Sequence, residues 1–174
     1  LHVIDNIEID PSWSAFRCMD HGRRNPTACI WVAITPNNEY IAFDEYEGVD
    51  KTIFQNVSAI VSKSGNQLEK RGSRKFDIGI FDRFTEKQVG TDSQQYIFDV
   101  IDGRSFRSPD NNTKMLIGDL YKMAGLERIK GAPVQLVENT IPVIKEMLRI
   151  DPTRKHIITG KMGAPRFYVL KRCK

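Results

Sequence analysis

Two segments of this sequence share a pattern that constrains the fold: each is an apolar, strand-like run that ends in an aspartate close to a glycine. The first covers residues 16–22 and contains Asp20, and the second covers residues 96–103 and ends in Asp102. An aspartate at the end of a strand is held on a rigid backbone yet reaches solvent or a ligand. If the two strands are neighbours in one sheet, their carboxylates meet at one edge and form a candidate site for a divalent cation.

Each aspartate also has a purely structural interpretation. Asp20 can cap the turn into residues 23–27, and an Asp-Gly pair such as Asp102-Gly103 is typical of a hairpin turn. The hairpin interpretation weakens because residues 104–106 do not begin an obvious returning strand. Asp99 lies on the same predicted strand, but residues three apart point to opposite faces. We therefore expect Asp102, rather than Asp99, to join Asp20.

Composition predicts one compact domain with a modestly basic surface. The chain has 174 residues, 40% of them hydrophobic, with a net charge of +4 and a pI near 9.0. Clustered basic residues favour a polyanionic partner, although such a surface can also serve solubility alone. The cysteines form no CxxC pair, which favours a reducing compartment. No stretch approaches the roughly 20 apolar residues of a membrane span and no leader is recognisable, so we expect a soluble protein without a membrane partner.

The first half of the chain predicts a three-stranded antiparallel meander followed by a helix. The strands are expected at residues 16–20, 28–34 and 40–46, with turn residues between the last two. A helix is expected over residues 51–64, with Asp50 as N-cap and Gly65 as its C-terminal stop. The first fifteen residues are interpreted as an entry linker or an edge segment, and residues 16–174 as the domain.

The second half predicts alternating strands and helices, which makes the domain α/β. A basic, glycine-containing insertion is expected over residues 66–90, irregular or bearing a hairpin, with one apolar run at 76–81. Pro142 is expected to kink the last helix. The further predicted elements are a strand ending at Asp102, a polar loop at 104–112, a helix at 113–124, a short strand at 126–131, a helix after Pro133, and late strands at 157–158 and 166–170 around a turn at 160–163.

Two further residues near the predicted carboxylate pair are considered for chemistry. Acidic residues crowd the end of the third strand, and Glu45 is the candidate to orient a metal-bound water, unless this edge is merely solvated. His21 adjoins Asp20, but strand alternation should turn it to the other face, which favours a structural use. The chain lacks the phosphate-loop spacing GxxxxGK[ST], so we expect no ATP-binding site.

Basic residues supply candidate contacts to a nucleic-acid backbone. For those in the insertion, an ordinary solvated loop is an equally good interpretation, and Lys161 is included on its charge alone. The candidate DNA contacts are Arg23, Arg24, Lys70, Arg71, Arg74, Lys75, Arg104 and Lys161.

Several of these motifs together resemble a known family, the nuclease domain of the large terminase subunit of tailed bacteriophages. The likeness runs over most of the chain, and the opening D-x-G followed by Asn-Pro-Thr-Ala is its most specific part. The motifs that carry it are Asp20-His21-Gly22 with residues 25–28, the strand at 40–46, residues 102–106, Gly125-Leu126 and residues 163–169.

The resemblance implies a ribonuclease-H-like mixed sheet with helices on both faces, and a Mg²⁺- or Mn²⁺-dependent endonuclease. Such an enzyme cuts concatemeric viral DNA during packaging by two-metal hydrolysis in the host cytoplasm. Asp20 matches the family's first acid and Asp102 its second. The family's third acid follows a strand like residues 166–170, so we expect this nuclease domain to be C-terminally incomplete. The implied partners are double-stranded DNA, an ATPase motor domain, the portal and the small terminase subunit.

Two other function classes stay open at this point. One is a non-catalytic DNA-binding or packaging-interaction module that retains the acids without using them. The other is a fragment of an actin-like or sugar-kinase fold, which can also open with an aspartate-x-glycine turn after a strand. Nucleotide binding would favour this last class, and the missing phosphate-loop residues count against it.

Overall fold

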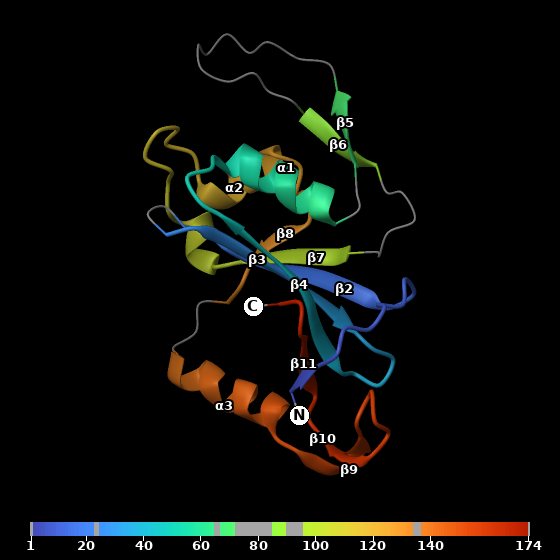
Figure 1. Cartoon of the computed structure of the whole chain (residues 1–174). Coiled ribbons are helices and arrows are strands. Elements are labelled where there is room, and N and C mark those ends of the chain that lie inside the picture. The colour runs from blue at the N-terminus through green and yellow to red at the C-terminus, as the bar shows by residue number, and fades with distance from the viewer. Residues whose placement is uncertain are drawn as a thin grey trace.

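A mixed seven-stranded sheet runs through the protein, with strand order β1-β11-β4-β3-β2-β7-β8 (Figure 1). The computed structural model describes residues 2–22, 25–64, 67–71, 85–89, 96–133 and 137–173. The strands of the sheet are β1 (Val3–Ile4), β2 (Ser14–Asp20), β3 (Thr27–Ile34), β4 (Tyr40–Gly48), β7 (Tyr96–Ile101), β8 (Ile129–Gly131) and β11 (Phe167–Leu170).

The predicted fold class is confirmed. Strands β2, β3 and β4 form the antiparallel meander, and β7 then pairs in parallel with β2 while β8 pairs in parallel with β7. Figure 1 shows α1 (Ile53–Lys63) and α2 (Ile117–Met123) on one side of the sheet and α3 (Val137–Leu148) on the other. At one edge, β1 and β11 add two further parallel strands beside β4.

The core lies between the sheet and the first two helices. Helix α1 buries Val57, Ile60 and Val61, the three- and four-residue spacing of one helix face, in the same cluster as Trp31 of β3 and Tyr121 of α2. Burial of this stripe is what holds α1 on the sheet. On α3, by contrast, Ile141, Val143 and Ile144 remain exposed.

Helix α1 begins two residues later than its predicted cap. Thr52, not Asp50, is the N-cap: its hydroxyl accepts from the backbone N–H of Gln55, and the Gln55 side chain accepts from the N–H of Thr52. Asp50 instead has a φ of 53°, which places it in the preceding turn. The prediction of Asp50 was wrong because the reciprocal capping box outweighs a single acidic residue. Gly65 lies outside the described residues.

Two other predicted elements differ from the structure. Residues 113–116 are not part of α2, because Leu116 pairs with Pro109 in an isolated bridge and Lys114 adopts a φ of 60°. Residues 157–158 were predicted to form a strand but lie in the turn between β9 (Asp151–Lys155) and β10 (Met162–Ala164).

The basic insertion does carry a two-stranded antiparallel pair, β5 (Gln67–Arg71) with β6 (Thr85–Val89). Within the described residues of the segment, this pair agrees with the expected hairpin. The apolar run at 76–81 lies outside the described residues.

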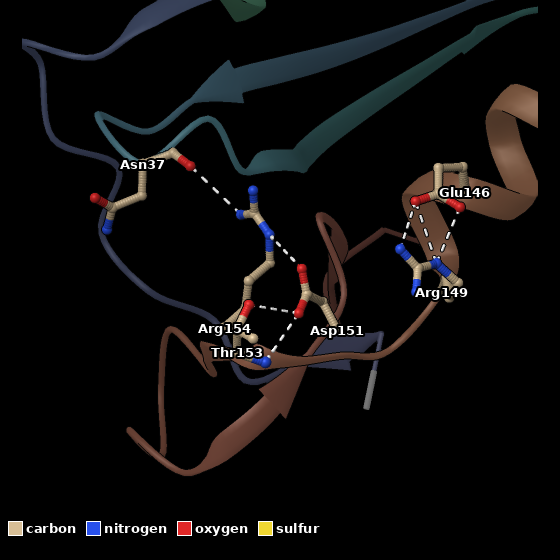
Figure 2. A network of polar contacts seen from close by, with 6 residues as sticks. All are labelled: Asn37, Glu146, Arg149, Asp151, Thr153 and Arg154. Carbon is tan, nitrogen blue, oxygen red and sulfur yellow. Dashed lines mark hydrogen bonds and ion pairs between the residues drawn. The ribbon is translucent and has the colours of Figure 1, made fainter.

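A polar network fixes the β9–β10 hairpin at the end of α3 (Figure 2). Asp151 accepts hydrogen bonds from the backbone and hydroxyl of Thr153 and lies 3.7 Å from the Nε of Arg154. Arg154 also donates to the carbonyl of Asn37, in the turn between β3 and β4. This contact ties the hairpin to the β2–β3–β4 meander, which lies much earlier in the sequence.

None of the described helices is long and apolar enough to span a membrane.

Candidate functional site

Asp20 and Asp102 lie at the same ends of two neighbouring parallel strands. Met19 of β2 is in register with Ile101 of β7, and each is followed directly by the aspartate. Neighbouring strands are about 4.8 Å apart, so this register brings the two backbones together at the positions of the acids. Along β2, buried Ala15, Arg17 and Met19 alternate with more exposed residues, and Asp20 ends the exposed series.

Both carboxylates line one open pocket of about 520 Å³. Positions 20 and 102 therefore border the same opening, and their convergence on a cation and their role in catalysis stay predictions. The residues around this acid pocket, as we call it, are Asp20, His21, Gly22, Asn25, Asp102, Arg104, Ser105, Ser108 and Ile117.

Asp102 serves a local structural purpose as well as facing the pocket. It caps the 3-10 helix η1 (Gly103–Phe106), with its Oδ1 accepting from the backbone N–H of Arg104 at 2.9 Å. Its Oδ2 lies 3.5 Å from the Nε of Arg104, in a pair whose side chains are 45% and 77% exposed, respectively. An exposed pair of this kind contributes little, so Arg104 leaves the carboxylate available to a cation.

Asp99 is committed to the opposite face of the sheet. It is buried and accepts from the guanidinium of Arg17, at 2.5 Å from Nε and 3.1 Å from Nη2. As expected, Asp99 does not line the acid pocket with Asp102. A carboxylate already paired in this way has no free oxygen for a metal ion.

His21 also borders the acid pocket, although alternation predicted that it would turn away from Asp20. The alternation ends with β2 at Asp20, so it no longer directs the next side chain. The Nδ1 of His21 lies 3.1 Å from the hydroxyl of Tyr121, and the two rings meet edge to face. Burial raises the pKa of Tyr121 to about 12, so this hydroxyl keeps its proton at neutral pH and anchors the imidazole.

Glu45 is not among the residues that line the acid pocket. It is in register with Ile30 of β3, which is in register with Cys18, so it lies two strands away and below the level of Asp20. The acid level with Asp20 is Glu47, through Ala28. Counting register from the turn between β3 and β4 would have placed Tyr46 opposite Ala28, because the register shift between Trp31 and Val32 that brings Glu47 there has no signal in the sequence. The geometry does not favour Glu45, and its role stays a prediction.

The candidate DNA contacts are scattered relative to the acid pocket. Arg104 lines it, whereas Lys161 lines a different pocket of about 420 Å³ beside Val3 and Lys171, at the β1–β11 side of the sheet. Lys161 is thus separated from β2 by β4 and β3. Arg23, Arg24, Arg74 and Lys75 lie outside the described residues, and for Lys70 and Arg71 of β5 only the backbone is described.

The donor set of the acid pocket suits a hard cation. Two carboxylates offer the oxygen ligands that Mg²⁺ prefers, and Mg²⁺ is commonly held by one or two carboxylates together with waters and substrate phosphates. Within the described part of the chain, His, Cys, Asp and Glu side chains form no group of three or more that could enclose a metal ion. The binding of a metal ion by Asp20 and Asp102 stays a prediction.

The sheet order and the connections between its strands define a ribonuclease-H-like α/β domain. In fold the chain is similar to the P22 large terminase nuclease domain, with a TM-score of 0.54 and 14% sequence identity over 98% of this chain and 68% of that chain. It is also similar to the large terminase from a thermophilic bacteriophage, with a TM-score of 0.50 and 13% identity over 82% of this chain. The chain spans only 28% of that second protein. No protein-family model and no curated protein sequence matches the chain.

Proposed function

We propose that this domain is a metal-dependent endonuclease that hydrolyses DNA phosphodiesters in the acid pocket. The observation that carries the proposal is the pair of carboxylates delivered to one open pocket by adjacent parallel strands. The likeness in fold to two terminases, one of them described as a nuclease domain, adds support. The resemblance in the D-x-G and Asn-Pro-Thr-Ala motifs points the same way.

Asp20 and Asp102 would hold Mg²⁺ or Mn²⁺ through their carboxylate oxygens. A bound ion of this kind supplies Lewis acidity and an activated water, and a second ion would be expected once a further acid completes the site. The residues around the pocket have separate tasks. Arg104 can contact a phosphate once a cation replaces it as the partner of Asp102. Tyr121 fixes the orientation of His21, which lines the acid pocket. Asn25, Ser105 and Ser108 add polar groups around the same opening.

The largest expected effect of a substitution is on cleavage. Asp20→Asn and Asp102→Asn should each abolish Mn²⁺-dependent nicking of a supercoiled plasmid, since an amide is a weaker ligand for a hard cation than a carboxylate. The measurement is the rate of conversion of supercoiled plasmid with Mn²⁺, Mg²⁺ or EDTA. Asp119→Asn is a matched control, because Asp119 lies on α2, pairs with Lys122 and does not line the acid pocket. Full activity in both pocket variants would remove these aspartates from the mechanism.

The biological setting is proposed from the terminase likeness. By that resemblance the substrate is concatemeric viral double-stranded DNA in the host cytoplasm, and the partners are an ATPase motor domain, the portal and the small terminase subunit. The association is measured by co-purification of a terminase motor domain with a tagged form of this domain. Equal retention of the motor domain when the tagged domain is left out would contradict it.

A second candidate is a DNA-binding or packaging-interaction module without catalysis. The observation that favours it is that the described residues offer two metal ligands at the acid pocket and no third. Salt-sensitive DNA binding without cleavage in Mn²⁺ would support this function, and metal-dependent nicking that disappears in Asp20→Asn would exclude it.

A further inference from the structure

The face of the sheet that leads to the acid pocket carries a second feature, a pair of aromatic rings. Phe16 of β2 and Phe98 of β7 are register partners, and their rings stack with centroids 5.2 Å apart and planes 23° apart. Both side chains are partly exposed, whereas their strand neighbours Arg17 and Asp99 are buried on the other face. Each phenylalanine stands four residues before one of the two aspartates: Phe16 belongs to the same more exposed series of β2 as Asp20, and Phe98 precedes Asp102, the residue that follows β7.

The space between the rings and the acids is filled by a continuous, partly exposed apolar strip. Cys18 and Val100, register partners of each other, separate the rings from the aspartates. Ile30 of β3 lies beside Cys18 and is 43% exposed. Four residues of strand span about 13 Å, close to the rise of about four nucleotides of a helical strand.

A lysine borders this strip on its other side. Lys130 of β8 is the register partner of Val100, is exposed, and holds its Nζ 5.8 Å from the centre of the Phe98 ring. That distance falls within the range of a cation–π contact. The strip therefore combines two stacked rings with a cation beside them, next to a pocket that also contains Arg104.

We propose that Phe16, Phe98 and Lys130 form a binding platform for the unpaired bases of a DNA strand held at the acid pocket. Bases stack on aromatic side chains irrespective of their sequence, and a neighbouring lysine pairs with the backbone. In a duplex the base faces are covered by their own neighbours, so the platform acts on a melted or single-stranded segment. The proposal rests on the proposed function for the nature of the substrate, and it adds which form of the DNA is held and by which residues.

The test is direct binding, which needs no cleavage. Asp20→Asn protein is titrated against a fluorescently labelled single strand and the matching duplex in EDTA, with anisotropy as the readout. Phe98→Ala in this background should weaken single-strand binding about 5- to 150-fold, as expected from the loss of one stacked base, while changing duplex binding little. Phe16→Ala is a second, independent variant, and Phe98→Tyr, which keeps a stacking ring, should retain the affinity.

Lys130→Ala should reduce the slope of log affinity against log salt by about one. Phe167→Ala on β11 is the matched aromatic control, because Phe167 is also partly exposed and β4 and β3 separate its strand from β2; it should bind both DNA forms as the Asp20→Asn protein does. Equal single-strand affinity in Phe98→Ala and Phe167→Ala would overturn the platform and leave this face as a protein-docking surface. An equal loss of duplex binding would also overturn it. Metal-dependent plasmid cleavage that depends on Asp20 would stand in either case. Absence of all DNA binding in this assay would overturn the platform, whereas the proposed function is judged by plasmid cleavage in Mn²⁺.

Discussion

Asp99 and Asp102 are the same residue type on the same strand, three positions apart, yet their surroundings are opposite. Asp99 is 3% exposed and receives two hydrogen bonds from Arg17, which itself is 1% exposed. Asp102 is half exposed, and its partner Arg104 is more exposed still. The comparison separates a carboxylate whose charge is already satisfied inside the protein from one whose charge remains available at the surface.

The buried pair of Arg17 and Asp99 belongs to a larger hydrogen-bond network. Arg17 donates to the hydroxyl of Ser64 as well as to Asp99, and Trp31 donates to the same hydroxyl. The guanidinium also lies 4.7 Å from the centre of the Tyr96 ring. This network joins β2, β3 and β7 to the end of α1, directly beneath the exposed face. We infer that it holds β2 beside β7 and thereby sets the spacing of the two aspartates above.

The largest stability effect is expected from breaking the buried pair. Arg17→Met removes the cation and leaves Asp99 buried without its charge partner, which should lower the free energy of unfolding by about 3–5 kcal/mol. Urea unfolding followed by circular dichroism measures this change. Arg104→Met is the matched control at the surface and should change it by less than about 0.5 kcal/mol. Similar losses in the two variants would erase the contrast between the two carboxylates.

An intermediate effect is expected at Ser64, which lies between Arg17 and Trp31. Ser64→Ala removes the acceptor for both donors while leaving the Arg17–Asp99 pair in place. Buried donors without partners cost about 1–3 kcal/mol, so the variant should be less damaging than Arg17→Met. Thermal and urea unfolding test the ranking, and a loss larger than that of Arg17→Met would show that Ser64, not the ion pair, dominates the network.

The sequence predicts this contrast because it follows from the two-residue period of a strand. Alternation, which depends only on local backbone geometry, is enough to predict that Asp99 and Asp102 do not share a site. The approach of Asp20 to Asp102 needed a further hypothesis, that their two strands are neighbours, because it depends on how β2 and β7 pair. Alternation fails at His21, because it has no meaning beyond the end of β2. It also could not give the partner of Asp99, because Arg17 lies 82 residues away and their contact depends on how β2 and β7 are paired.

Helix caps and short apolar runs were harder to predict than the carboxylate pair. Asp50 and Thr52 are both acceptable caps by residue type, and only the reciprocal contact with Gln55 distinguishes them. Residues 157–158 have the composition of a strand, yet the adjoining segments pair as β9 and β10 and leave them in the turn. Lys161 was included for its charge, and charge carries no information about which side of the sheet a residue occupies.

The smallest effect is expected at Asp102 itself, and it decides whether that residue is structural or functional. Asp102 caps η1 through Oδ1, and asparagine offers an equivalent oxygen to the N–H of Arg104. Asp102→Asn should therefore change the free energy of unfolding by less than about 0.5 kcal/mol. Asp102→Ala, which removes the cap, should cost about 0.5–1 kcal/mol. A carboxylate at the surface can be neutralised without cost only where the fold does not depend on its charge. If Asp102→Asn were instead as destabilising as Arg17→Met, the fold would depend on that charge. Loss of plasmid cleavage in the variant would then report unfolding rather than the loss of a metal ligand.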